Sequence, residues 1–232
     1  MNRAIFLTIA SFLLAALPLS ASSVSGGCGA FMIGFDMPNL GNLNDKLEAN
    51  GYGSFDNKFL ATGGFGYAAV KSIILGGEGA GESQIIKNDS LKAKLSAGYG
   101  LFDIGYVVFS SPVALIFPVI GIGGGGTDLT LWRTDMSLQF DSILANPGIT
   151  TVLNTGGLIL KGELDFLFFP PLGKGSSQPN GIMLGARVGY MYMPQKASWK
   201  FEDIDVSDGP DSRLNGLYIH FMIGMGGFFI GE

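Results

Sequence analysis

The stretch from Leu214 to Ile230 alternates along its length between apolar residues and small or polar ones. One parity is continuously apolar, while the other mixes glycine with the chain's single histidine, His220. Successive side chains of a β-strand point to opposite faces, so this period of two predicts a long strand with one apolar face. In a soluble sheet the apolar face packs on a second layer. In a transmembrane barrel it faces lipid, and the other face lines the lumen.

The same alternation recurs in seven further segments, which predicts an all-β chain. The apolar parity changes midway through 91–109, which is explained either by a bulge near Gly100 within one strand or by a hairpin that makes two strands. The bulge is preferred because it gives an even count of eight and keeps long and short connections alternating. The expected strands are 30–37, 58–70, 73–83, 91–109, 113–127, 157–169, 182–193 and 214–230.

Three long connections, 39–56, 128–154 and 194–213, alternate with shorter ones. Long outer loops and short periplasmic turns are typical of outer-membrane barrels. Leucines at helical spacing predict a short helix over 40–49, and a second short helix is expected over 137–145.

Composition agrees with curved, hydrophobic strands. Glycine contributes 37 of the 232 residues, more than twice the usual ~7%. Hydrophobic residues make up 47% and charged residues 14%, yet no run beyond residue 21 approaches the ~20 apolar residues of a transmembrane helix. The formal net charge of −5 argues against a nucleic-acid partner, because such proteins need a basic face.

The N-terminus has the features of a secretory signal peptide: Arg3 in a short positive region, an apolar region over 4–19, and small residues ending at Ala21. We therefore expect cleavage near Ala21, which leaves 22–232 as a single barrel domain. Cys28 then lies close to the new N-terminus. Lipid attachment there would need an apolar residue three positions earlier, where Ser25 stands, so a free thiol is favoured.

Parity places several charged side chains on the inward face of the last strands. With short connections, Glu163 would lie opposite Arg187, and Arg187 opposite His220. A shift of either register by two residues would keep all three side chains inside. An eight-stranded barrel is just wide enough for side chains to fill it, so paired charges that plug the lumen are the main interpretation; a ligand-binding or proton-conducting lumen is the alternative. The predicted lumen cluster comprises Lys161, Glu163, Asp165, Arg187, Tyr218 and His220.

The sequence predicts no catalytic, cofactor-binding or metal-binding residues. It contains no G-x-S-x-G motif, and a single histidine leaves little for a metal site. The glycines at 123–126 are not followed by the Lys-Ser/Thr pair of a phosphate-binding loop. An outer-membrane lipid-modifying enzyme, the least favoured alternative, would need a serine and a second catalytic partner near His220.

Together the signal peptide, the eight alternating segments and the aromatic strand ends resemble small outer-membrane β-barrel proteins of the OmpA/OmpX type, over most of residues 30–230. Such proteins usually finish on an aromatic residue that the barrel-assembly machinery recognises. Phe229 has the required alternating apolar residues before it, but Gly227 interrupts them and residues 230–232 extend past it. The resemblance implies insertion into an outer membrane and no particular activity.

The expected fold is therefore an eight-stranded, antiparallel, up-and-down transmembrane β-barrel with short helices in its loops. The expected role is structural, or binding of a partner through 39–56, 128–154 and 194–213, with outer-membrane lipid and the assembly machinery as further partners. The alternative from another class is a secreted, lipocalin-like barrel that carries an apolar ligand. Such a carrier would line its interior with apolar groups, whereas this chain is expected to place charges there.

Overall fold

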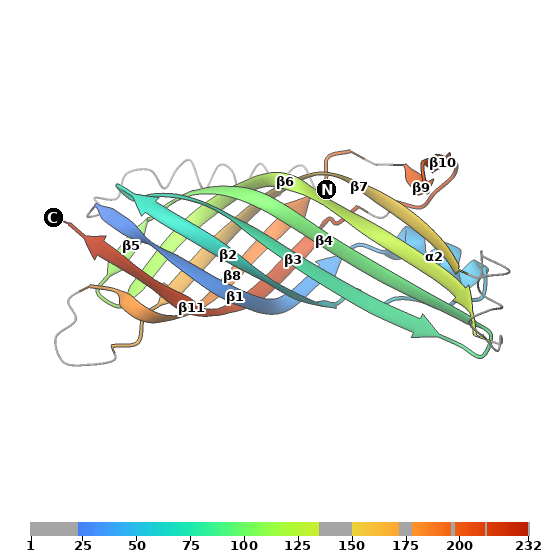
Figure 1. Cartoon of the computed structure of the whole chain (residues 1–232), viewed down its shortest axis with the longest axis horizontal. Coiled ribbons are helices and arrows are strands. Elements are labelled where there is room, and N and C mark those ends of the chain that lie inside the picture. Colours follow the sequence, from blue (N-terminus) through green and yellow to red (C-terminus); the bar gives the residue numbers. More distant parts are fainter. Residues whose placement is uncertain (1–22, 135–149, 172–177, 196–197, 212, 232) are drawn as a thin grey trace, which may run out of the picture.

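The computed structural model describes residues 23–134, 150–171, 178–195, 198–211 and 213–231. Its eight long strands form one closed antiparallel ring, in which each strand pairs with its neighbours in the sequence of long strands, and β1 pairs with β11 to close it (Figure 1). The predicted eight-stranded barrel is confirmed. The strands are β1 Val24–Pro38, β2 Phe59–Val70, β3 Ile73–Lys87, β4 Leu91–Tyr106, β6 Ala114–Arg133, β7 Thr150–Phe168, β8 Asn180–Tyr192 and β11 Gly216–Ile230.

The two ends of the barrel differ. One end carries α2 (Gly41–Ala49) and the small hairpin of β9 (Trp199–Phe201) and β10 (Ile204–Val206), at the right of Figure 1. The other end carries short turns, the three-residue strand β5 (Phe109–Ser111) and the C-terminal end of β11. We call these the loop end and the turn end.

Helix α2 confirms the helix predicted from the leucine spacing. Leu43 and Leu47 are buried on its inner side and pack with Phe59 and Leu95 in an apolar cluster that fills the loop end. Within the described ranges, no helix is both long and apolar enough to cross a bilayer. The helix predicted over 137–145 and the signal peptide with its cleavage site near Ala21 lie outside the described residues.

The faces of β11 follow the predicted parity. On β11, Leu217, Ile219, Phe221, Ile223 and Met225 point outward and are 43–68% exposed. Tyr218 and His220 point inward and are 0% and 1% exposed. Outward apolar residues on the other strands continue this pattern around the barrel, including Phe31, Leu60, Leu75, Phe102, Ile122, Leu164 and Val188.

The predicted bulge near Gly100 is wrong. Strand β4 pairs with β3 in one unbroken register from Tyr106 to Lys92, and with β6 from Gly105 to Leu91. Leu95 and Leu101 both point inward, whereas Phe102 and Ile104 point outward. The apolar parity changes because the inward face is apolar at the loop end, where the outward face carries lysines instead. No extra residue is inserted.

Several strands are longer than predicted. Residues 128–133 and 150–154, expected within an irregular loop, extend β6 and β7, and 128–132 pair with 150–154. The polar connection 194–213 contains the β9–β10 hairpin, which attaches to β7 through Leu153 and Phe201. Strand β1 begins at Val24, so Cys28 lies within it, half-buried against the apolar cluster at the turn end. Strands of 12–20 residues exceed the ~9–11 needed to cross a bilayer, so parts of them project beyond it.

The barrel interior is packed in layers. At the turn end, Val24, Leu115, Phe117, Phe169 and Phe228 belong to one buried apolar cluster. At the loop end, α2 and Trp199 contribute to another. A third small cluster, which includes Leu101, Ile159 and Met191, lies along the strands that also carry the buried charged residues. The charges therefore share a closed interior with apolar side chains.

Candidate functional site

A group of buried polar side chains crosses the barrel between the apolar clusters; we call it the charge layer. Among the described residues it contains two cationic side chains, four carboxyl groups and two tyrosines, and each is less than 8% exposed. Six different strands supply them. Its members are Tyr67 on β2, Glu78 on β3, Asp103 on β4, Lys161, Glu163 and Asp165 on β7, Arg187 on β8 and Tyr218 on β11.

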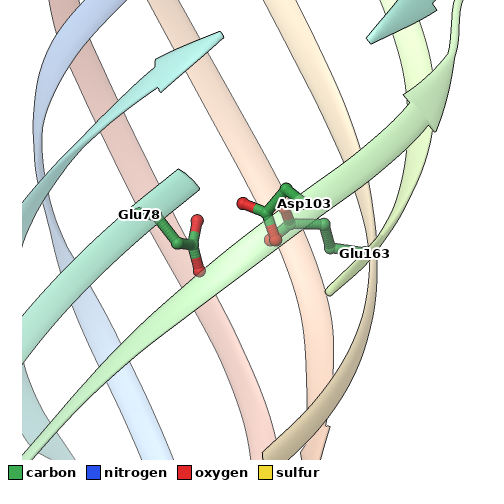
Figure 2. Close-up of side chains that lie close together, drawn as sticks. All are labelled: Glu78, Asp103 and Glu163. Atoms are coloured by element: carbon green, nitrogen blue, oxygen red, sulfur yellow. The ribbon is translucent and has the colours of Figure 1, made fainter. Parts of the chain in front are cut away.

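Lys161 lies at the centre of three carboxyl groups. Its Nζ is 2.6 Å from Glu163 Oε1, 2.7 Å from Glu78 Oε1 and 3.2 Å from Asp103 Oδ1. Figure 2 shows these three carboxyl groups converging inside the barrel. One oxygen of each lies within 4.8 Å of the others, a spacing that suits a metal ion. The ammonium group of Lys161 takes the place that such an ion would need.

Arg187, on the strand next to that of Lys161, shares two of these carboxyl groups and adds Asp165. Its Nη1 pairs with Glu78 Oε2 and lies 3.7 Å from Glu163 Oε2, while Nη2 is 2.9 Å from Asp165 Oδ2. The guanidinium also lies 4.6 Å from the centre of the Phe65 ring, within the range of a cation–π contact. Glu78 therefore bridges Arg187 and Lys161, which come from adjacent strands.

Two tyrosines supply further hydrogen bonds. Tyr218 Oη donates to Glu163 Oε2 at 2.6 Å. Tyr67 Oη donates to Asp103 Oδ2 at 3.1 Å and accepts from Arg187 Nη2 at 3.2 Å. Four carboxyl groups exceed two cations in formal charge, so these neutral donors add hydrogen bonds to carboxylate oxygens that the cations alone do not neutralise. A buried charge is tolerated when it is paired and hydrogen-bonded, and is costly otherwise.

His220 belongs to a second pair beside the charge layer. Its Nε2 is 2.6 Å from Asp36 Oδ1 on the neighbouring strand β1, and its ring stacks against Tyr218 with centroids 5.0 Å apart. Asp36 and His220 are both buried. This contact occupies Nε2 and fixes the orientation of the imidazole.

All six residues of the predicted lumen cluster lie inside the barrel, but their pairing differs in part from the prediction. Arg187 is opposite His220, as predicted. Glu163 is not opposite Arg187: β7 and β8 are shifted by two residues, so that Asp165 faces Arg187 and Glu163 faces Gly189. The predicted register needs a connection between β7 and β8 that is two residues shorter than the one in the structure. Parity alone cannot detect such a shift, because a slide of two residues leaves every side chain on the same face.

Four members of the interior, Tyr67, Glu78, Asp103 and Asp36, were not predicted from the sequence. Each stands at the inward parity of its strand, and Glu78, Asp103 and Asp36 are acidic residues within otherwise apolar or glycine-rich segments. An acidic residue flanked by outward apolar residues, as Asp103 is by Phe102 and Ile104, is the signal that could have identified them.

The chemistry open to the charge layer is limited by access. Within the part of the chain that the structure describes, the ion-paired side chains are 0–1% exposed, so they are closed off from direct contact with solvent. What the geometry provides is cross-linking: Lys161 and Arg187 tie β7 and β8 to β3 and β4, strands that they do not pair with.

No protein-family model matches the sequence, and no curated protein matches it. Among solved structures, the chain is similar to Ail, the attachment invasion locus protein of Yersinia pestis, with 10% identity, 90% of this chain and 99% of that chain covered, and a TM-score of 0.46. It is similar to outer membrane protein OprG from Pseudomonas aeruginosa (15% identity, 90% and 97% covered, TM-score 0.37). It is also similar to Neisserial surface protein A, with 9% identity, 91% of this chain and 99% of that chain covered, and a TM-score of 0.37. These are small bacterial outer-membrane β-barrel proteins, and the likeness concerns the fold.

Proposed function

We propose that this chain is an outer-membrane β-barrel whose lumen is plugged by the charge layer and the apolar clusters beside it. Its role is structural, or it binds a partner through the outer loops 39–56, 128–154 and 194–213. It is not an enzyme in this proposal. One observation carries this proposal. Large apolar side chains point outward along the strands and charged side chains point inward, which is the opposite of the arrangement in a soluble protein.

The outward apolar surface supports membrane insertion. A soluble monomer rarely exposes a contiguous apolar patch of more than a few hundred Å². Here every long strand contributes outward aliphatic or aromatic side chains, so the apolar surface is a belt around the barrel. In a bilayer this belt faces acyl chains, and the closed ring of strands leaves no unpaired strand edge in the hydrocarbon region.

The packed interior supports a plugged lumen. Phe117, Leu167 and Met183 fill the turn end, and the charge layer is cross-linked by the contacts of Lys161 and Arg187. Moving ions through such a layer would require these buried pairs to separate, which is costly in a low-dielectric interior. The same feature weighs against the lipocalin-like alternative, because a carrier needs an apolar cavity inside.

The ordered structure of the loop end supports a binding role over a purely structural one. Leu40, Leu43 and Leu47 fix α2 against the barrel mouth, and Trp199 is buried, with its Nε1 donating to Pro210 O at 2.9 Å. These contacts hold α2 and the β9–β10 hairpin as preformed surfaces above the belt. Preformed surfaces lose less entropy on binding than flexible ones.

The decisive experiment expresses the whole chain in a Gram-negative host, separates the inner and outer membranes, and compares gel mobility with and without boiling. We expect carbonate-resistant protein in the outer membrane whose mobility changes on boiling. A soluble periplasmic product with unchanged mobility would exclude the membrane barrel and favour the carrier. A planar-bilayer recording on the purified barrel tests the plug, since steady ionic conductance would contradict it.

A further inference from the structure

A pocket opens on the outer wall of the barrel at the loop end, away from the charge layer. Its volume is about 360 Å³, within the usual range for small-molecule sites. Three of its residues, Met37, Leu217 and Tyr190, stand directly opposite one another on β1, β11 and β8 and form its floor. The polar residues that complete it come from the start of α2 and from the segment before β11.

The floor of the pocket continues into the apolar belt. The next outward row toward the turn end is Phe35, Ile219 and Val188, which are also directly opposite one another and are 43–50% exposed. A molecule seated in the pocket with an apolar chain could therefore lay that chain along this row. The pocket lies where the belt meets the polar loops, with Tyr190 in its floor, and tyrosines are enriched at membrane–water interfaces.

The polar wall of the pocket is held in place before any ligand binds. Arg213 Nε donates to Asp211 Oδ1 at 2.9 Å, and Nη2 donates to Asp211 Oδ2 at 2.6 Å. Asn215 accepts from the Met193 amide at 2.6 Å through its Oδ1, and its own carbonyl accepts from the Asn39 amide at 3.1 Å. The pairing of Arg213 with Asp211 does not involve Nη1, so that nitrogen keeps its donors for another acceptor.

The charges of the wall define the ligand. Arg213 and Asp211 place one cation and one anion side by side, and their formal charges cancel. Arginine N–H groups match phosphate oxygens in geometry, while a carboxylate and the face of an aromatic ring such as Tyr190 both attract an ammonium group. A headgroup that carries one phosphate and one ammonium therefore complements this wall better than an anionic one.

We propose that this pocket binds the headgroup of a zwitterionic phospholipid of the surrounding membrane, with the phosphate on Arg213, the ammonium toward Asp211, and an acyl chain along Phe35, Ile219 and Val188. This inference rests on the proposed membrane location. It assigns to the barrel a specific lipid site in addition to its general contact with the bilayer.

The test is native mass spectrometry of the full chain released from non-ionic maltoside micelles that contain either phosphatidylethanolamine or phosphatidylglycerol. We expect one phosphatidylethanolamine molecule to remain bound, with phosphatidylglycerol at least tenfold weaker. Arg213→Gln should weaken phosphatidylethanolamine retention about tenfold, as expected for the loss of a charge-assisted hydrogen bond, and Asp211→Asn should reduce the preference between the two lipids.

Matched controls are Lys200→Gln and Asp205→Asn, which make the same charge changes at exposed positions of the β9–β10 hairpin outside the pocket. Equal retention by Arg213→Gln and the wild type, or equal binding of both lipids, would overturn the proposal. Displacement of the lipid by inorganic phosphate alone would instead indicate a simple anion site. Boiling-dependent mobility of the same samples separates the two proposals: an unfolded barrel contradicts the membrane function, whereas a folded barrel without lipid contradicts only the pocket.

Discussion

Asp165 on β7 lies directly opposite Arg187 on β8, and the two side chains meet inside the barrel, with Nη2 donating to Oδ2 at 2.9 Å. This pair fixes the register of two strands that parity leaves free to slide by two residues. Arg187 also reaches Glu78 on the far wall, so the pair connects neighbouring strands to a distant one. The consequences of removing such contacts can be measured.

Replacing Arg187 with alanine should lower the free energy of unfolding by about 3–5 kcal/mol, because Asp165 would remain buried without its cation and Glu78 would keep Lys161 but lose Arg187. Urea titration of the barrel in phosphatidylcholine vesicles, followed by tryptophan fluorescence, measures the change. Lys200→Ala, at an exposed position, is the control and should change stability by no more than ~0.5 kcal/mol. A wild-type unfolding curve for Arg187→Ala would remove the ion-pair interpretation.

Replacing Phe221 with arginine should cost about 2–4 kcal/mol in a bilayer, since its outward side chain lies midway along the belt on β11. The matched control is Ile204→Arg on the β10 hairpin, an isoleucine that is 67% exposed at the loop end. That substitution should be nearly neutral. Folding titrations into vesicles compare them, and equal costs would show that the assigned belt does not face lipid.

Lys161 and Asp103 should be energetically coupled, because their charged atoms are 3.2 Å apart in the buried layer. A double-mutant cycle of Lys161→Met and Asp103→Asn should give an interaction energy of about 0.5–3 kcal/mol. The comparison cycle pairs Asp103→Asn with Lys200→Met, whose effects should add within ~0.5 kcal/mol. Strict additivity in the first cycle would mean that Asp103 does not depend on Lys161.

Replacement of glycine by alanine should have opposite effects on stability at two positions of the barrel. A Cβ at Gly121 would lie 2.4 Å from Asp103 Oδ1 and 2.6 Å from Lys161 Cε, so Gly121→Ala should cost about 1–3 kcal/mol by overpacking the charge layer. A Cβ at Gly66 would meet no atom within 4 Å, so Gly66→Ala should be neutral or stabilising by up to ~1 kcal/mol. Thermal unfolding of both variants checks this, and a milder effect at Gly121 than at Gly66 would contradict the inward placement of Gly121.

Much of the barrel was predictable because a strand alternates its side chains regardless of what surrounds it. The opposite facing of Ile219 and His220 follows from adjacent positions in one strand, and the helix over 40–49 follows from leucine spacing. Strand β4 is the exception. An inward apolar face looks the same in sequence as an outward one, so the inward packing of Leu95 at the loop end has the same sequence pattern as a bulge that shifts the alternation by one residue.

The sequence by itself determined the alternating strands in outline, the opposite faces of β11, and the inward position of Lys161, Glu163, Asp165, Arg187, Tyr218 and His220. Only the tertiary structure decided which of these charges meet. Closure of the barrel brings Glu78 to Arg187 across 109 positions of the chain and Tyr67 to Glu163 across 96. Such contacts depend on the shear and diameter of the whole ring, which are set by the registers of all eight strands together, and no local pattern encodes that sum.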